Sequence, residues 1–386
     1  MKFNLMKKNI HAITVLIIIN VLINSGCRDN ISNPDESLKN LALYAVIDGN
    51  KSGFLIIDYA TMAVEDSFYT TPYVPKGIEF SGDYKEWYSI WKSSSSGNKL
   101  YAINTVSKGI KRNTSCKGDL LTLSGDKNNI IVFGDRIIQF YNRENFSLLY
   151  EDSIGNISKI VSSQTKRLIY CLGNSLDNKR FGVFVYDLNT KKLLRFVPLK
   201  DSVQQRSMVA SDIKISPNDE YLYISIFTWA NGFSGFGSFM VMDISNDNII
   251  NDYVSGGMSQ LAVSGDGKNV FISDPAGYGI ELPPTYKIFY FTNNFYNTFI
   301  DWRTFFNTST FNGSVNSSQE IIMSPDNKSL VTNVVGSLKT EEGKLIQILK
   351  IGISKKETIS SFSFPTDIHG HITQRIKKMK IGKYFK

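Results

Sequence analysis

Three side chains near the C-terminus have the types and spacing that metal binding requires. Asp367, His369 and His371 alternate along the chain, so on a strand they would project to the same side. Two imidazoles and a carboxylate are donors that zinc accepts. The sequence offers no fourth ligand and places Gly370 between the histidines, so a solvated segment competes with a weak metal site at His369 and His371.

The patterns that accompany catalysis are missing from the sequence. It contains no Gly-x-Ser-x-Gly elbow, no phosphate-binding loop and no Cys-x-x-Cys pair. The acidic pairs Glu341-Glu342 and Asp201 with Asp212 are more simply solvated loop charges. We therefore expect no catalytic residue and no cofactor.

The N-terminus has the organisation of an export signal. Three lysines among the first eight residues precede an apolar stretch from Ala12 to Asn24, which is shorter than the roughly 20 residues of a membrane-spanning helix. Ser25-Gly26 then precedes Cys27, and this segment resembles the lipobox of bacterial lipoproteins, although Asn24 stands where the family usually has Leu. The resemblance implies lipidation of Cys27. Ordinary signal-peptidase cleavage and an uncleaved anchor are the alternatives.

The lipoprotein interpretation divides the chain into a signal peptide (1–26), a tether (27–40) and one domain (41–386). It predicts a lipid-anchored protein of the cell envelope whose partners are the membrane and another envelope protein or a glycan. Because Arg28 rather than Asp follows Cys27, analogy with lipoprotein sorting favours the outer membrane or cell surface over the inner membrane.

The charge of the chain argues against a nucleic-acid partner. The formal net charge of +8 falls to about +5 without the signal peptide, and six positive charges lie in the last twelve residues. The rest of the domain is nearly neutral, whereas nucleic-acid binders usually carry a basic face. Beyond Cys27 only Cys116 and Cys171 remain, and buried, unpaired thiols are the favoured interpretation.

A repeat determines the expected architecture. An apolar run ending in Ser, a turn pair and a second apolar run recur. The serines of these hinges are Ser81, Ser124, Ser162, Ser216, Ser264 and Ser324, separated by 43, 38, 54, 48 and 60 residues. These intervals are close to the 40 to 50 residues of a four-stranded propeller blade.

Each repeat has room for four short strands. The Gly-Asp and Pro-Asp pairs favour tight turns, and the Ser and Asp side chains can bond to nearby backbone amides. The sequence therefore predicts an all-β propeller, most simply with seven four-stranded blades. The first repeat, at about 41–70, lacks its innermost strand, and a C-terminal strand at about 372–385 is expected to complete it.

The Ser-Pro-Asp and Ser-Gly-Asp hinges, followed by runs such as Tyr221-Leu222-Tyr223-Ile224-Ser225, resemble the YVTN-type and Tol-associated propeller repeats. The resemblance covers about residues 40–386. It implies the fold, but it is poor evidence for function, because that superfamily hosts scaffolds, lactonases, peptidase lids and surface proteins.

Long loops are expected on one face of the disc. The second-to-third and interblade connections are long, whereas the hinges are short. The long loops carry aromatic side chains that have no obvious core to fill, which makes them candidates for ligand binding. The candidates are Trp229, Phe233, Phe236, Tyr278, Phe305 and Phe306, and Trp302 and Phe311 share the pattern. Alternatively, the loops fold back and bury these rings.

These observations favour a non-catalytic binding or scaffold propeller of the envelope. The alternative is a hydrolase or lactonase-like enzyme with its site in the central channel. A divalent cation or clustered acid and base side chains in that channel would favour the enzyme.

Overall fold

The computed structural model contains one compact unit from Asn40 to Lys386. The structure describes residues 40–49, 51–93, 97–134, 136–178, 180–200, 208–229, 235–255, 257–274, 287–292, 295–302, 315–336, 345–364 and 374–384. The proposed signal peptide, Cys27 and nearly all of the tether lie outside these ranges. Within them, no helix is long and apolar enough to cross a membrane.

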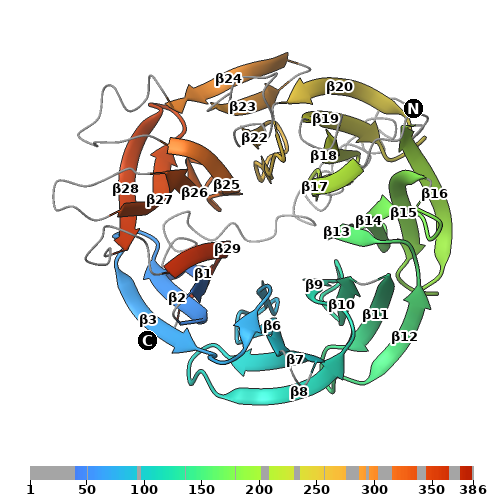
Figure 1. Cartoon of the computed structure of the whole chain (residues 1–386), viewed down its shortest axis with the longest axis horizontal. Helices are drawn as coiled ribbons and strands as arrows, with labels where there is room; N and C mark the ends of the chain where they lie inside the picture. Colours follow the sequence, from blue (N-terminus) through green and yellow to red (C-terminus); the bar gives the residue numbers. More distant parts are fainter. Residues whose placement is uncertain are drawn as a thin grey trace, which may run out of the picture. The chain divides into compact units, whose positions relative to one another are not determined.

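Seven antiparallel sheets form a ring, which confirms the predicted seven-bladed β-propeller (Figure 1). Listed from the innermost strand outward, the blades are β29 (Gln374–Lys383), β1 (Leu41–Gly49), β2 (Gly53–Asp58), β3 (Val64–Tyr69); β4 (Val74–Pro75) and β5 (Glu79–Phe80), β6 (Glu86–Ser93), β7 (Gly97–Asn104), β8 (Ile110–Cys116); β9 (Leu120–Leu123), β10 (Asn129–Gly134), β11 (Ile137–Asn142), β12 (Leu148–Ser153); β13 (Ile157–Ser162), β14 (Leu168–Asn174), β15 (Phe181–Asp187), β16 (Leu193–Lys200); β17 (Met208–Ile215), β18 (Tyr221–Trp229), β19 (Gly235–Asp243), β20 (Ile249–Ser255); β21 (Leu261–Val263), β22 (Val270–Asp274), β23 (Lys287–Thr292), β24 (Phe295–Asp301); and β25 (Val315–Met323), β26 (Ser329–Gly336), β27 (Leu345–Gly352), β28 (Glu357–Phe364).

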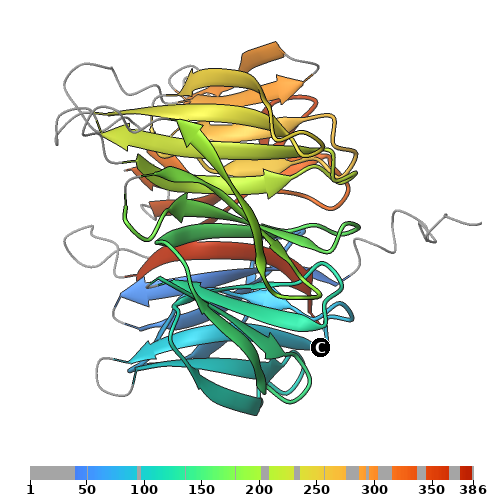
Figure 2. The same cartoon turned by 90° about the vertical axis from the view of Figure 1, so that its right-hand side faces the viewer.

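The C-terminal strand closes the ring, as the incomplete first repeat predicts. β29 pairs antiparallel with β1 as the innermost strand of the first blade, and Figure 2 shows it as the red strand beside the blue strands of that blade. The backbone N–H of Tyr384 donates to the Asn40 carbonyl at 2.7 Å. The two ends of the domain are therefore held together by strand pairing.

The hinge serines organise their turns through side-chain hydrogen bonds. The buried Ser124 hydroxyl donates to the Asp126 carboxylate at 2.5 Å and accepts from the Asn129 backbone N–H at 2.9 Å. The hinges at Ser81, Ser264 and Ser324 repeat both bonds. Each hydroxyl thus links the turn to the start of the second strand, as expected from the motif.

The fourth blade departs from the predicted hinge by one residue. The backbone N–H of Ser163 bonds to the Leu168 carbonyl, which is the pairing that Ser124 makes with Asn129. The hinge serine is therefore Ser163, and the assignment to Ser162 was wrong. The Ser163 hydroxyl donates to Asp219 of the next blade at 2.7 Å, so this hinge is braced by its neighbour.

Replacing one hinge serine should have a measurable cost. We expect Ser124→Ala to lower the free energy of unfolding by about 1–3 kcal/mol, because the Asn129 N–H and the Asp126 carboxylate lose a buried partner. Urea denaturation measures this change. Ser153→Ala, at an exposed position on β12, is the control, and equal effects of the two substitutions would contradict the role of the hinge.

Aromatic side chains fill the spaces between blades. The ring of Trp87 on β6 lies 5.1 Å from that of Tyr44 and 4.7 Å from that of Phe54, which belong to the first blade. Cys116 and Cys171 are buried free thiols in two different core clusters, which confirms the interpretation of both as core residues. The blades are therefore held side by side mainly by apolar packing.

Candidate functional site

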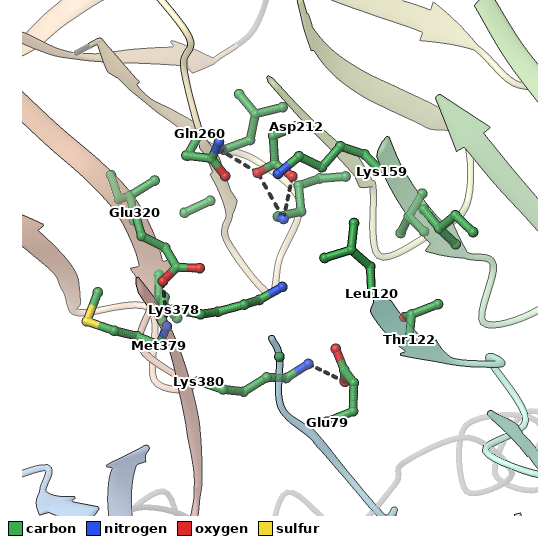
Figure 3. A pocket seen from close by; sticks show the side chains of 18 of the residues that line it. Glu79, Leu120, Thr122, Lys159, Asp212, Gln260, Glu320, Lys378, Met379 and Lys380 are labelled. Carbon is green, nitrogen blue, oxygen red and sulfur yellow. Dashed lines mark hydrogen bonds and ion pairs between the residues drawn. The ribbon is translucent and has the colours of Figure 1, made fainter. Parts of the chain in front are cut away.

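A cavity of about 800 Å³ lies at the centre of the ring, among the innermost strands of the blades (Figure 3). Its lining contains six lysines and three acidic side chains, so its formal charge is +3 when all are ionised. These residues are Lys76, Glu79, Lys159, Asp212, Lys214, Glu320, Lys377, Lys378 and Lys380. The central channel was expected only as the site of the alternative, enzymatic function.

Irregularities in the innermost strands coincide with the charged side chains. The register of β13 shifts just before Lys159, that of β17 just before Asp212 and that of β25 just before Glu320. The β1–β29 ladder shifts next to Lys378. A β-bulge changes the direction of the side chains at the irregularity, and these four side chains from four blades all line the same cavity.

Asp212 is a buried carboxylate with several partners. It is 5% exposed, lies 2.9 Å from the Lys214 ammonium and accepts the Leu261 backbone N–H at 2.9 Å. Burial by itself would raise the pKa of this carboxyl. The positive charges of Lys214 and Lys159 and the hydrogen bonds outweigh burial and hold the pKa of Asp212 below its ordinary value. Asp212 is therefore a fixed negative charge in the channel wall.

Glu320 lies at the same bulge position two blades further on. For this carboxyl, the effect of burial on the pKa outweighs that of the neighbouring charges and hydrogen bonds. Burial raises the pKa of its carboxyl to about 7, and Lys378 and the Met379 backbone N–H offset only part of this shift. The carboxyl is therefore partly protonated at neutral pH. Both the charge of the channel and its capacity to donate a hydrogen bond change near that pH.

The lysines of the channel fall into two groups. Lys214 pairs with Asp212, and Lys380 pairs with Glu79. The side chains of the other four lysines make no hydrogen bond or ion pair with any residue that the structure describes; these are Lys76, Lys159, Lys377 and Lys378. Burial lowers the pKa of the Lys159 ammonium, Lys378 and Lys214 lower it further, and Asp212 opposes the change. Of these four, Lys159 and Lys378 are the two that Figure 3 shows beside the cavity without a direct anionic partner.

Only two of the candidates from the long loops fall in the described part of the chain. Trp229 ends β18 and Phe236 lies on β19, both half-buried, and the Trp229 ring lies 4.9 Å from that of Phe227. Phe233, Tyr278, Phe305, Phe306, His369 and His371 lie outside the described residues. The binding role of the loop face and the weak metal site remain predictions.

Two further residues lie elsewhere than in solvated loops. Trp302 is 2% exposed in the core between the sixth and seventh blades, which agrees with the alternative that the loop aromatics are buried. Asp212 was expected to be a solvated loop charge and is instead buried in the channel. It lies on an innermost strand, where a carboxylate persists because Lys214 neutralises it.

The hinge motif contains a signal for the channel residues that was not used. Each position four residues before a hinge serine lines the cavity. These positions hold Gly77, Leu120, Lys159, Asp212, Gln260 and Glu320. The polar residues at these positions, compared across the repeats, would have predicted charged side chains in the central channel. Lys159 takes this position only when Ser163 is the hinge serine of the fourth blade.

Comparisons with known proteins support the fold but no family. No family model matches the sequence, and no curated protein matches it. Among solved structures, hydrazine synthase from Kuenenia stuttgartiensis is similar to 74% of this chain over 88% of its own, with 12% sequence identity and a TM-score of 0.54. At this identity the likeness shows the architecture alone, and the chain is a seven-bladed β-propeller.

Proposed function

We propose that this protein is a ligand-binding propeller and that its central channel binds an anion. The observation that carries the proposal is the pair Lys159 and Lys378, which project into a cavity of about 800 Å³ without an ion-pair partner among the described residues. Desolvating ammonium groups is costly unless an anion compensates. A bound anionic ligand would provide that compensation.

The sequence supports a location for this binding function. A basic and apolar N-terminus followed by Ser25-Gly26-Cys27 favours export and lipid anchoring, and we propose a protein tethered to the cell envelope, at the outer membrane or cell surface. The hinge repeats favour a relationship to YVTN-type or Tol-associated propellers. A protein or glycan partner on the face with the long loops is compatible with a channel ligand.

One observation favours an enzyme as the second candidate. Glu320 has a pKa of about 7, and Lys159 has a lowered pKa in the same cavity. Perturbed acids and bases cluster at catalytic sites. Turnover of a bound ligand that Glu320→Gln abolishes would favour this alternative, whereas binding without turnover favours the first.

The anion-binding function is tested with the full chain and small anions. We expect inorganic phosphate and acetate to raise the melting temperature of the parent protein. Lys159→Met with Lys378→Met should remove this effect by eliminating the two unpaired charges to which the proposal assigns the anion. The matched control is Lys85→Met with Lys355→Met, whose side chains are 78% and 76% exposed. Equal responses of the two double variants would contradict the proposal.

A further inference from the structure

The channel presents hydrogen-bond acceptors as well as cations. One carboxyl oxygen of Glu320 accepts the Met379 backbone N–H, and the other makes no hydrogen bond among the described residues. The Gln260 amide donates to the Ser211 carbonyl at 2.8 Å, and its own carbonyl oxygen has no described donor. A ligand that satisfies this wall must carry hydrogen-bond donors in addition to a negative charge.

The geometry brings these two kinds of group to one space. Figure 3 shows the side chains of Lys159, Gln260, Glu320 and Lys378 reaching toward the channel from four different blades. The cavity is much larger than a compact inorganic anion needs and lies within the range of sites for small organic ligands. Aliphatic side chains, including Leu120 and Ile322, also line it, so the site can contact C–H groups.

We propose that the ligand is a small polyhydroxylated carboxylic acid. Its carboxylate lies near the ammonium groups of Lys159 and Lys378, and its hydroxyl groups bond to Glu320 and Gln260. This assignment rests on the proposed function, because it requires that the channel be the binding site. It goes further because it assigns the carboxylate of the ligand to the lysines and the hydroxyl groups to Glu320 and Gln260.

Two properties of the site favour a hydroxy acid over a zwitterion. The lining carries more lysines than acids, so it attracts a ligand with net negative charge. A hydroxyl group both donates and accepts, so it pairs with Glu320 whether that carboxyl is ionised or protonated. An ammonium group needs the ionised form, which is only partly populated at neutral pH because burial raises the pKa of Glu320.

Three probes separate the two halves of the proposed ligand in calorimetric titrations of the full chain. D-glucuronate carries a carboxylate and hydroxyl groups, D-glucose carries the hydroxyl groups without the charge, and acetate carries the charge alone. We expect glucuronate to bind at least about tenfold more tightly than acetate, which corresponds to one or two additional hydrogen bonds. Glucose should show no measurable binding.

Two kinds of variant assign the contacts. Lys159→Met with Lys378→Met should reduce glucuronate binding to the level of glucose, whereas Lys85→Met with Lys355→Met should not. Glu320→Ala should remove the preference for glucuronate over acetate while acetate still binds. Glu320→Gln keeps an acceptor oxygen and should retain the preference.

The outcomes distinguish this inference from the function on which it rests. Equal affinity for acetate and glucuronate, with both lost in the double lysine variant, would overturn the hydroxy-acid assignment and leave the anion-binding channel standing. Binding of glucose as strong as that of glucuronate would also overturn it. No binding of any probe, together with no effect of phosphate on the melting temperature, would overturn both proposals.

Discussion

Deletion of residues 372–386 should abolish cooperative folding of the ring. The deletion removes β29, which pairs along the length of β1 from Leu41 to Gly49. It exposes the edge of β1 and removes the buried side chains of Ile376 and Met379. Each of these contributes about 1.5–3 kcal/mol by burial alone, and the lost ladder adds to this. Such a loss is comparable to the whole stability of many domains, roughly 5–15 kcal/mol.

Urea denaturation and size-exclusion chromatography measure this result. We expect the truncated chain to aggregate through the unpaired edge of β1 or to unfold without a sharp transition. Deletion of residues 385–386 alone, which follow β29, is the control and should leave the transition in place. If the larger deletion melts like the parent protein, the ring does not depend on β29 for closure.

Glu320→Gln should stabilise the protein, and the gain should depend on pH. The pKa of this carboxyl rises from an ordinary value of 4.5 to about 7 on folding, so the folded state holds a proton that the unfolded state releases. Stability is therefore lost as the pH rises from about 4.5 to about 7. The shift corresponds to about 3 kcal/mol, and glutamine, which cannot ionise, avoids this loss.

The comparison is made by urea denaturation of the parent and the variant at pH 5 and pH 8. The gain should approach 3 kcal/mol at pH 8 and fall to about 1 kcal/mol or less at pH 5, where Glu320 remains protonated in the folded protein. Glu357→Gln serves as the control, because that side chain is 57% exposed. A gain of the same size at both pH values would refute the role of ionisation.

The predictions for Glu320→Gln and for Lys159→Met with Lys378→Met share one physical basis, the free-energy cost of charge that has no partner. A carboxyl with a raised pKa and lysines without partners are unfavourable groups in a folded protein, and natural sequences usually keep such groups for function. Variants that remove these groups should therefore gain stability, and Lys159→Met with Lys378→Met should lose anion binding at the same time. A purely structural role for these side chains would produce the opposite correlation.

The pattern of local hydrogen bonds and apolar strands was readable in the sequence. A hinge such as Ser124 to Asn129 spans six residues, and its bonds form within the turn itself. The incomplete first repeat predicted closure by a C-terminal strand, because a blade without its innermost strand leaves an unpaired edge. Blade number, strand order and closure could therefore be predicted without the structure.

The binding site depended on the ring. Lys159, Asp212, Glu320 and Lys378 lie far apart in the sequence and come from four blades, and in isolation each is one polar residue in a strand. Only closure of the seven blades brings them around one cavity, where burial and mutual charge shift the pKa of Asp212 downward and that of Glu320 upward. Hydrogen bonding within a repeat is a short-range property that the sequence determines, whereas desolvation and electrostatic coupling across the axis exist only in the closed tertiary structure.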